Sequence, residues 1–196
     1  MHNSRLLLKG HIKHNIYLAS ASNDLSIKIW DTTTGSLKYT FDSSNGGHDD
    51  YIESLASLSN GYLASGSYDN TVKIWDIVNG VLKFTLTSHT NTIDTLLSIA
   101  NDRMASGSYD NSIKIWNPNT GALISTFDST NGGHTDYVNA LTLLDNGMIA
   151  SASYDKSIKV WDLSTSSCKW TFDSSNNGHS DNINDLSTLG LIQVFT

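Results

Sequence analysis

The stretch ASGSYDNTVKIWD at residues 64–76 decides the fold, because close copies of it occur at three other places in the chain. The copies are ASASNDLSIKIWD (19–31), ASGSYDNSIKIWN (105–117) and ASASYDKSIKVWD (150–162). Their tryptophans, Trp30, Trp75, Trp116 and Trp161, are separated by 45, 41 and 45 residues. A period of this length is typical of repeat architectures, in which each unit buries its faces against its neighbours.

The second copy shows what one unit builds. The dipeptide Asn60-Gly61 favours a tight hairpin turn, and Asp69-Asn70 favours another, because short Asx side chains bond the nearby backbone. Gly80 then breaks the chain before a last apolar segment. We therefore expect four short antiparallel strands in about 40 residues. These strands are YIESLASL (51–58), YLASGS (62–67), TVKIW (71–75) and VLKFTL (81–86).

The composition indicates one domain built from strands and turns. Of the 196 residues, 38% are hydrophobic and 16% charged, and the net charge of −7 opposes binding to nucleic acid. Lys73, Lys114 and Lys159 recur at one repeat position, where we expect solvated charges. The single cysteine, Cys168, excludes an intrachain disulfide and fits a reducing compartment.

Neither end of the chain predicts a targeting or membrane segment. The start, MHNSRLLLKGHIKH, has no apolar core of signal-peptide length, and the end, LGLIQVFT, is too short to span a bilayer. We expect an intracellular protein, cytoplasmic or nuclear, that binds neither a membrane nor nucleic acid.

The repeats closely resemble the WD-repeat (WD-40) family of β-propellers. The Trp-Asp pair that names the family ends three of the copies, and the third copy ends in Trp116-Asn117. The family's other mark, Gly-His ahead of the first strand, occurs as Gly47-His48, Gly133-His134 and Gly178-His179, while Ser88-His89 keeps the histidine alone. His48, His89 and His134 each precede their tryptophan by 27 residues.

The resemblance implies an all-β fold of propeller blades, each with four antiparallel strands. We expect four complete blades and a partial fifth, in an incomplete ring; a small four-bladed ring is the alternative. Residues 1–196 then form a single WD-repeat domain, with units at roughly 2–42, 43–87, 88–128 and 129–173 and a partial unit at 174–196. The fifth unit follows the repeat to residue 189 and holds at most two strands.

The resemblance also implies a hydrogen-bonded tetrad of His, Ser, Asp and Trp in each repeat. Such groups can form a closed relay, because indole only donates, a carboxylate only accepts, and the hydroxyl and imidazole do both. The first unit has no clear histidine, since His2 lies 28 residues before Trp30, one position out of register. The tetrads are His48, Ser65, Asp69 and Trp75; His89, Ser106, Asp110 and Trp116; His134, Ser151, Asp155 and Trp161; and, without histidine, Ser20, Asp24 and Trp30.

Repetition argues against catalysis and metal binding by these residues. A catalytic Ser-His-Asp set is needed once, but this set recurs in one register, with its serine in a regular strand rather than a strained elbow. His11 and His14 form the only close histidine pair, and they lack cysteine or carboxylate partners at ligand spacing. We predict no catalytic residue, no metal site and no cofactor.

The candidate partner-binding residues are tyrosines on the repeat loops. Three of them precede the tetrad aspartates at the turn between the second and third strands, and two begin first strands on the same face. Tyrosine is enriched at interface hot spots; the alternative is that these rings only pack on neighbouring loops. The candidates are Tyr51, Tyr68, Tyr109, Tyr137 and Tyr154.

Acidic residues surround these tyrosines in the sequence, so the face should favour a basic or polar partner segment. The loops that begin at Asp42, Asp128 and Asp173 are either part of this surface or flexible and solvated. Asp50, Asp136 and Asp181 add charge just after the repeat histidines. On the outer strands, Trp170 aligns with Tyr39 and Phe84 as a packing residue, and Cys168 aligns with leucines as a small buried hydrophobe.

The leading hypothesis is a non-enzymatic scaffold that binds a partner protein or peptide on the loop face, as the resemblance implies. The alternative is a substrate-recruiting subunit of a ubiquitin-ligase complex, which needs an adaptor motif outside these residues. An enzyme is a distant third. Because an open arc leaves an apolar face at each end, we also expect the chain to self-associate through its open ends.

Overall fold

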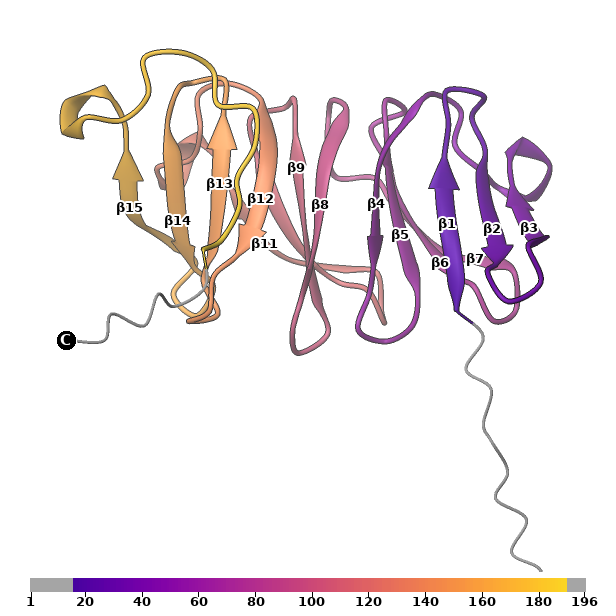
Figure 1. Cartoon of the computed structure of the whole chain (residues 1–196). Helices are drawn as coiled ribbons and strands as arrows, with labels where there is room; N and C mark the ends of the chain where they lie inside the picture. The colour runs from indigo at the N-terminus through magenta and orange to yellow at the C-terminus, as the bar shows by residue number, and fades with distance from the viewer. Residues whose placement is uncertain (1–15, 190–196) are drawn as a thin grey trace, which may run out of the picture.

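Four β-sheets stand side by side in an arc (Figure 1). The structure is a computed structural model, and it describes residues 16–189. Within that range the first sheet has three strands, the other three have four each, and there is no α-helix. No helix in this part of the chain has the length and apolarity needed to cross a bilayer. The expected all-β fold of successive blades is confirmed.

Each sheet is one blade, and its strands follow one another in sequence order. The first blade contains β1 (Tyr17–Ala21), β2 (Ile27–Asp31) and β3 (Ser36–Phe41). The second contains β4 (Ile52–Ser57), β5 (Leu63–Ser67), β6 (Val72–Asp76) and β7 (Val81–Leu86). The third contains β8 (Ile93–Ile99), β9 (Arg103–Ser108), β10 (Ile113–Asn117) and β11 (Ala122–Phe127). The fourth contains β12 (Val138–Leu143), β13 (Ile149–Ser153), β14 (Ile158–Asp162) and β15 (Ser167–Phe172).

The turns of the second blade form where the sequence predicts them. Gly61 and Asn70 both have left-handed backbone, with φ of 84° and 67°, in the turns that join β4 to β5 and β5 to β6. Gly80 has φ of 71° ahead of β7. In the fourth blade Ser166 replaces this glycine and still takes a positive φ of 52°. The repeated turn residues therefore fix the strand register of each blade.

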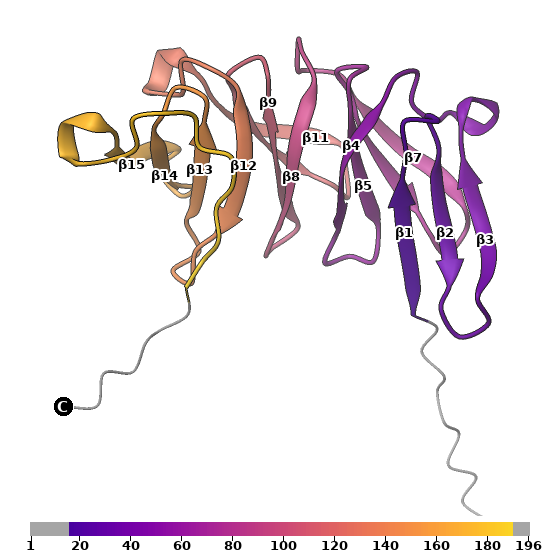
Figure 2. The ribbon, with the colours of Figure 1, turned by 45° about the horizontal axis from the view of Figure 1, so that its top comes forward.

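The first strands line the inner side of the arc. β8 contacts β4 on one side and β12 on the other, whereas β7, β11 and β15 are the outermost strands (Figure 2). The hydrophobic core lies between consecutive blades rather than within them. Between the second and third blades, for example, Val72, Ile74 and Leu86 pack against Met104 and Trp116. Each blade thus has a leading face, turned to the preceding blade, and a trailing face, turned to the following one.

An aromatic contact recurs at these interfaces. The last residue of an outer strand packs on the tryptophan of the next blade. The ring centroids of Phe41 and Trp75 are 4.4 Å apart, and those of Phe127 and Trp161 are 4.7 Å apart. Aromatic pairs add to the free energy gained from burial alone, so Trp75 and Trp161 each stabilise an interface as well as their own blade.

The repeated lysines are not the solvated charges expected from the sequence. Lys73 is buried, and its Nζ lies 3.4 Å from Thr85 Oγ1 on the neighbouring strand. Lys114 and Lys159 are half-buried and make the same contact, at 3.3 Å, with Thr126 and Thr171. The next strand offers each ammonium group a hydroxyl acceptor, which partly replaces the water lost on burial.

Trp170 also differs from the expectation, because 47% of its surface is exposed. Its counterparts Tyr39 and Phe84 are partly buried and pack against the core between their own blade and the next. Within the described residues no blade follows the fourth one, so Trp170 lacks the contact that a following blade gives, and the Lys169 Nζ lies over its ring, 4.7 Å from the centroid. Cys168 is half-buried and packs at the edge of the core between the third and fourth blades.

The long acidic loops form capped turns. Each begins with an aspartate that caps a 3-10 turn, η1 (Ser43–Asn45), η2 (Ser129–Asn131) or η3 (Ser174–Asn176). Asp42 accepts a hydrogen bond from Ser44 N at 2.9 Å, and Asn45 Oδ1 accepts one from Asp42 N at 3.0 Å. This reciprocal capping box gives the loops a defined conformation, in place of the flexible alternative.

The fifth unit forms no strand between residues 174 and 189. Instead, its chain runs along the inner strands of the fourth blade. Asn139 Nδ2 donates to Ile183 O at 2.6 Å, and the Ile183 side chain packs with Ala140 and Ala152. Ile183 therefore takes the place that the first residue of β8 or β12 takes on a preceding blade.

Candidate functional site

Three repeats close the hydrogen-bond tetrad predicted from the sequence. In the second blade the two ring nitrogens of His48 lie 2.7 Å from Ser65 Oγ and 2.7 Å from Asp69 Oδ2, and Trp75 Nε1 donates to Ser65 Oγ at 2.9 Å. Thus β5, β6, the turn between them and the loop before β4 are tied together. The corresponding distances in the third and fourth blades are 2.7–2.8 Å, in His89, Ser106, Asp110 and Trp116 and in His134, Ser151, Asp155 and Trp161.

Burial and hydrogen bonding shape the electrostatics of the tetrads. Burial alone would raise the pKa of Asp69, but hydrogen bonds from His48 and Thr71 outweigh it and hold the pKa well below its ordinary value. Asp110 and Asp155 behave in the same way. Burial lowers the pKa of His89 below its ordinary value, against the opposing hydrogen bond to Asp110. The tetrads therefore hold ionised aspartates at neutral pH.

Sequence reasoning missed two further hydroxyls in each network. Thr71 Oγ1 donates to Asp69 Oδ1 at 2.7 Å, and Ser67 Oγ donates to Asp50 O at 3.1 Å while it accepts from Asp69 N. Ser112 and Ser157 take the place of Thr71, and Ser108 and Ser153 take the place of Ser67. The signal was present in the repeat S-x-S-Y-D-x-[ST], whose second and third hydroxyls recur as faithfully as the first.

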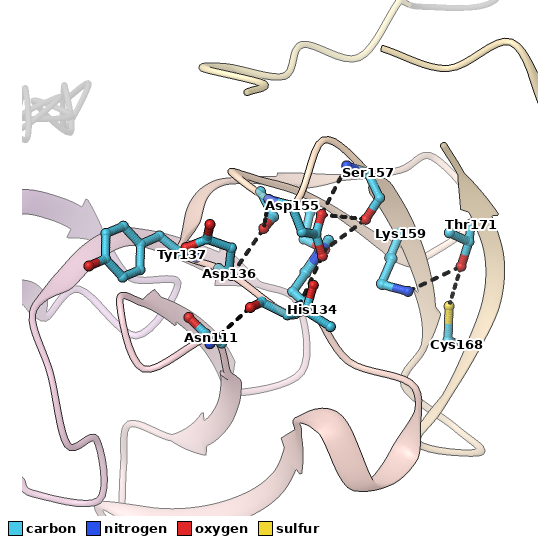
Figure 3. A network of polar contacts seen from close by, with 12 residues as sticks. Asn111, His134, Asp136, Tyr137, Asp155, Ser157, Lys159, Cys168 and Thr171 are labelled. Atoms are coloured by element: carbon cyan, nitrogen blue, oxygen red, sulfur yellow. Dashed lines mark hydrogen bonds and ion pairs between the residues drawn. The ribbon is translucent and has the colours of Figure 1, made fainter. Parts of the chain in front are cut away.

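Figure 3 shows this network in the fourth blade, with His134, Asp155 and Ser157 joined by hydrogen bonds and the Tyr137 ring directed away from them. The relay is enclosed: the His134 side chain and Ser151 are both fully buried. A substrate carbonyl cannot reach a serine oxygen that already accepts from tryptophan and contacts histidine. The geometry therefore supports a structural role for the tetrads.

The first blade has only part of a tetrad in the described residues. Trp30 Nε1 donates to Ser20 Oγ at 3.0 Å, and Asp24 Oδ1 accepts from Ser26. The position that His48 occupies in the second blade is filled by no residue between 16 and 189. His2, which is one position out of register for the tetrad histidine of the first unit, lies outside the described residues, as do His11 and His14.

The five candidate tyrosines lie along one edge of the arc, the upper edge in Figure 1, where β1 meets β2 and β5 meets β6. We call them the tyrosine surface. The backbone N–H of Tyr68 donates to Tyr51 O at 2.9 Å, and Tyr154 N donates to Tyr137 O at 3.0 Å. These bonds join the two tyrosine-bearing loops of the second and fourth blades, and in the third blade Tyr109 N donates to Thr92 O at 3.0 Å, so the five tyrosines lie on one face of the arc.

The rings form two groups rather than an even circle. Tyr109 stacks on Tyr137 with centroids 4.2 Å apart, and Tyr154 lies 5.8 Å from Tyr137, so one group spans the third and fourth blades. Tyr51 and Tyr68, 5.9 Å apart, form the other group on the second blade. Tyr109 and Tyr154 are half-buried, while Tyr51, Tyr68 and Tyr137 are exposed.

Two carboxylates that sequence reasoning did not single out lie beneath the tyrosine surface. Burial, then repulsion from Glu53, raises the pKa of Asp94, against a hydrogen bond from Tyr109. Burial, with the negative charge of Asp94, raises the pKa of Tyr109, and burial with the charge of Glu53 raises that of Tyr68. Glu53 and Asp94 occupy equivalent positions in β4 and β8. This repeated acidic position is visible in the sequence only once the strands are aligned.

The aspartates after the repeat histidines hold the tyrosine loops. Asp50 Oδ1 accepts from Tyr51 N and Asp136 Oδ1 from Tyr137 N, both at 2.8 Å. Their remaining oxygens add negative charge beside the rings. Asp181 makes the same turn with Asn182 N at 2.8 Å, although no tyrosine follows it.

A hollow of about 370 Å³ opens between the third and fourth blades at the opposite edge of the arc. It is lined by strand ends and turns, with Ile99, Arg103, Met148, Asp162 and Leu163 among its residues. No group of three or more His, Cys, Asp or Glu residues in the described chain is placed to hold a metal ion.

Comparisons with known proteins agree with this geometry. The family model described as "WD domain, G-beta repeat" matches residues 5–31, 35–76, 80–117 and 121–162, together more than half of the chain. A comparison with curated proteins finds no match. A solved structure described as "Structure of U3-55K" is similar over 86% of this chain, with a TM-score of 0.75 and 27% sequence identity. The alignment covers 50% of that structure, so this chain spans half of its length.

Proposed function

Because the chain belongs to the WD-repeat family of β-propellers, we propose that it is a non-enzymatic scaffold that binds a partner protein or peptide on the tyrosine surface. WD-repeat propellers generally serve as protein-interaction platforms. The main support for this binding site is the group of rings Tyr109, Tyr137 and Tyr154. The group spans two blades, and its central ring, Tyr137, is exposed. Rigid aromatic rings supply contact area at low entropic cost.

The chemistry of the surface favours a basic partner segment. Glu53 and Asp94 lie beneath the rings, Asp50 and Asp136 lie beside them, and the chain carries a net charge of −7. A lysine or arginine side chain can place its stem on a tyrosine ring and its charge near a carboxylate.

Other functions have less support. The tetrad serines are buried and already hydrogen-bonded, which speaks against an enzyme of the Ser-His-Asp type. Nothing in residues 16–189 favours a substrate-recruiting subunit of a ubiquitin ligase. An intracellular location, cytoplasmic or nuclear, is part of the proposal and rests on the single cysteine.

The test uses two synthetic peptides of equal length, one rich in Lys and Arg and one rich in Asp and Glu, each with a single aromatic residue. We expect the basic peptide alone to bind, with an affinity that falls as salt is raised. The triple variant Tyr68→Ala, Tyr109→Ala, Tyr154→Ala should lose this binding while it remains folded. Fluorescence anisotropy measures the affinity, and a thermal melt checks the fold.

A matched control changes exposed apolar residues away from the surface. Val78 and Ile124 are 71% and 47% exposed, in the turn after β6 and in β11. The double variant Val78→Ala, Ile124→Ala should bind the basic peptide like the unmodified chain. Unchanged binding by the triple tyrosine variant would place the site elsewhere, and the hollow beside Arg103 would then be tested first.

A further inference from the structure

The hollow between the third and fourth blades lies at the edge of the arc opposite the tyrosine surface, the lower edge in Figure 1. We call it the turn hollow, because it is lined by the turn from β8 to β9, the turn from β12 to β13 and the residues that follow β14. Its volume of about 370 Å³ falls in the range of roughly 300–1,000 Å³ that is usual for ligand pockets.

A hydrogen bond that ties the second blade to the third has no counterpart at the turn hollow. Asn60 Nδ2, in the turn from β4 to β5, donates to Asn119 Oδ1, which follows β10, at 2.8 Å. The equivalent residues one blade later are Asn101 and Ser164, and both line the hollow. Ser164 Oγ donates instead to Asp162 Oδ1 at 2.6 Å, and no bond joins it to Asn101 in the described chain.

The backbone of the turn from β8 to β9 also differs from that of its counterpart. Asn101 and Asp102 are both left-handed, with φ of 61° and 56°, whereas in the turn from β4 to β5 only Gly61 has a positive φ. Two successive left-handed residues give the turn a different path. The hollow therefore has a local cause in the dipeptide Asn101-Asp102, which replaces the Asn-Gly of the second and fourth blades.

Arg103 is the only basic residue among those that line the turn hollow. The equivalent residues of the second and fourth blades, Tyr62 and Met148, carry no charge. Arg103 is half-buried, and it makes no hydrogen bond or ion pair within residues 16–189. A guanidinium group stays charged and presents its N–H donors as a fork that matches a carboxylate. Arg103 therefore offers an unused site for a carboxylate.

Apolar side chains form the rest of the lining. Ile99 belongs to the core between the third and fourth blades, and Leu143 and Leu163 pack against that core. Leu143, Leu163 and Met148 are only half-buried. An aliphatic side chain placed in the hollow would remove this remaining apolar surface from water along with its own, and the flexible Met148 can adapt to its shape.

Acidic residues around the hollow limit how much negative charge it can accept. Asp162 is the only carboxylate in the lining, and hydrogen bonds from Ser164 lower its pKa, so it is ionised at neutral pH. Asp102 and Asp145 are exposed in the two turns, and the chain carries a net charge of −7. A strongly acidic segment is therefore repelled, whereas a single carboxylate can reach Arg103.

We propose that the turn hollow binds a partner segment in which aliphatic side chains stand next to a single carboxylate. The aliphatic side chains pack on Leu143, Met148 and Leu163, and the carboxylate pairs with Arg103. This surface is separate from the tyrosine surface and has the opposite charge preference. The scaffold can then hold two different partner segments at once, one on each edge of the arc.

The first experiment compares three short capped peptides of Gly and Ser, each with two adjacent leucines followed by Glu, Gln or Lys. Fluorescence anisotropy measures their affinities for the 196-residue chain. The Glu peptide should bind roughly tenfold more tightly than the Gln peptide, as expected for a charge-assisted pair, and the Lys peptide should bind most weakly. Equal affinities for Glu and Gln, tighter binding of Lys, or no binding of Glu up to millimolar concentration would overturn the proposal.

The second experiment removes the charge of Arg103. Arg103→Met, which introduces the residue found at this position in the fourth blade, should bind the Glu peptide only as weakly as the Gln peptide. Arg103→Lys, which keeps the charge without the fork, should give an intermediate affinity. Undiminished binding of the Glu peptide by Arg103→Met would overturn the proposal.

Lys83→Met is the matched control, since it changes the net charge equally on the exposed outer strand of the second blade. This variant should bind the Glu peptide like the unmodified chain. Circular dichroism checks that each variant is folded, and Arg103→Gln replaces Arg103→Met if that variant unfolds.

The third experiment locates the peptide by NMR of the methionine methyl groups. The Met148 signal should shift when the Glu peptide is added, whereas that of Met104, fully buried between the second and third blades, should not. Adding the basic peptide that tests the tyrosine surface should leave the shifted Met148 signal in place, whether or not that peptide binds. A Met148 signal that stays unchanged, or displacement of the Glu peptide by the basic one, would overturn the proposal of a separate site.

Discussion

The first and second blades contain nearly the same sequence, yet only the second is complete. Its tetrad closes through His48, and its tryptophan, Trp75, is fully buried under Phe41 of the preceding blade. The first blade has the equivalent Ser20, Asp24 and Trp30, but in the described chain it has neither the histidine nor the covering ring. Residues at equivalent repeat positions therefore differ in burial and in hydrogen-bond partners because the adjacent blades differ, as expected for a one-dimensional repeat array.

The largest expected difference between the two blades is at the tryptophans. Trp75→Ala should lower the free energy of unfolding by roughly 3–5 kcal/mol, because it removes a buried aromatic from a core between two blades. Trp30→Ala should cost much less, since its ring is half-exposed and uncovered. Chemical denaturation at low protein concentration measures both variants. Equal losses would show that the two blades are equally well packed.

The glycines before the outer strands give the next comparison. Gly35 and Gly80 both have φ of 71°, so alanine at either position should cost about 1–2 kcal/mol for a left-handed backbone. Gly80→Ala should cost about 1–3 kcal/mol more, because its Cβ would push the Tyr39 ring out of a packed interface. Thermal melts of both variants check the order. A Gly35→Ala variant as unstable as Gly80→Ala would mean that Gly35 is packed as closely as Gly80.

The tetrad aspartates provide a third comparison. Asp110→Ala should cost about 1–3 kcal/mol, because it leaves His89 and the N–H of Thr90 without their buried acceptor. Asp24→Ala should cost less, since the exposed Asp24 bonds, within residues 16–189, only to Ser22 and Ser26 of its own turn. Urea titrations measure both. An equally large loss at Asp24 would mean that its tetrad is complete.

Stability should also depend on pH through His89. Its pKa is lowered in the folded state from the ordinary value of 6.5, so the unfolded chain binds more protons. The free energy of unfolding should therefore fall as the pH drops below about 6.5, and fall again below about pH 4 as the tetrad aspartates are protonated. His89→Gln should be less stable at neutral pH but show a shallower first fall. A free energy of unfolding that stays constant between about pH 7.5 and about pH 5 would contradict this linkage.

Much of the fold followed from local sequence. Asn60-Gly61, Asp69-Asn70 and Gly80 placed the turns of the second blade, because each residue type suits the backbone found there. The tetrads followed from the resemblance to the WD-repeat family, and the constant spacing of the repeats assigned their residues in each unit. The hydroxyls of Thr71 and Ser67 were missed because attention went to the four residues of the resemblance and not to every repeated position.

Properties that depend on a neighbouring blade could not be predicted from the repeat alone. Lys73 was expected to be solvated, but it is buried beside Thr85. Trp170 was expected to pack like Phe84, but no described blade follows it. In the candidate site, the common face of the tyrosines was predictable, whereas the stacking of Tyr109 on Tyr137 depends on how two blades meet. The spacing of the repeats does not determine how side chains of two adjacent blades pack against each other.

The contrast between complete and incomplete tetrads is tested most directly by hydrogen exchange of the indole N–H groups, followed by NMR. Trp75, Trp116 and Trp161 should exchange slowly, because each donates to a buried serine. Trp30 should exchange faster, because it is half-buried and donates to the exposed Ser20. Exchange of Trp30 as slow as that of Trp75 would contradict this contrast.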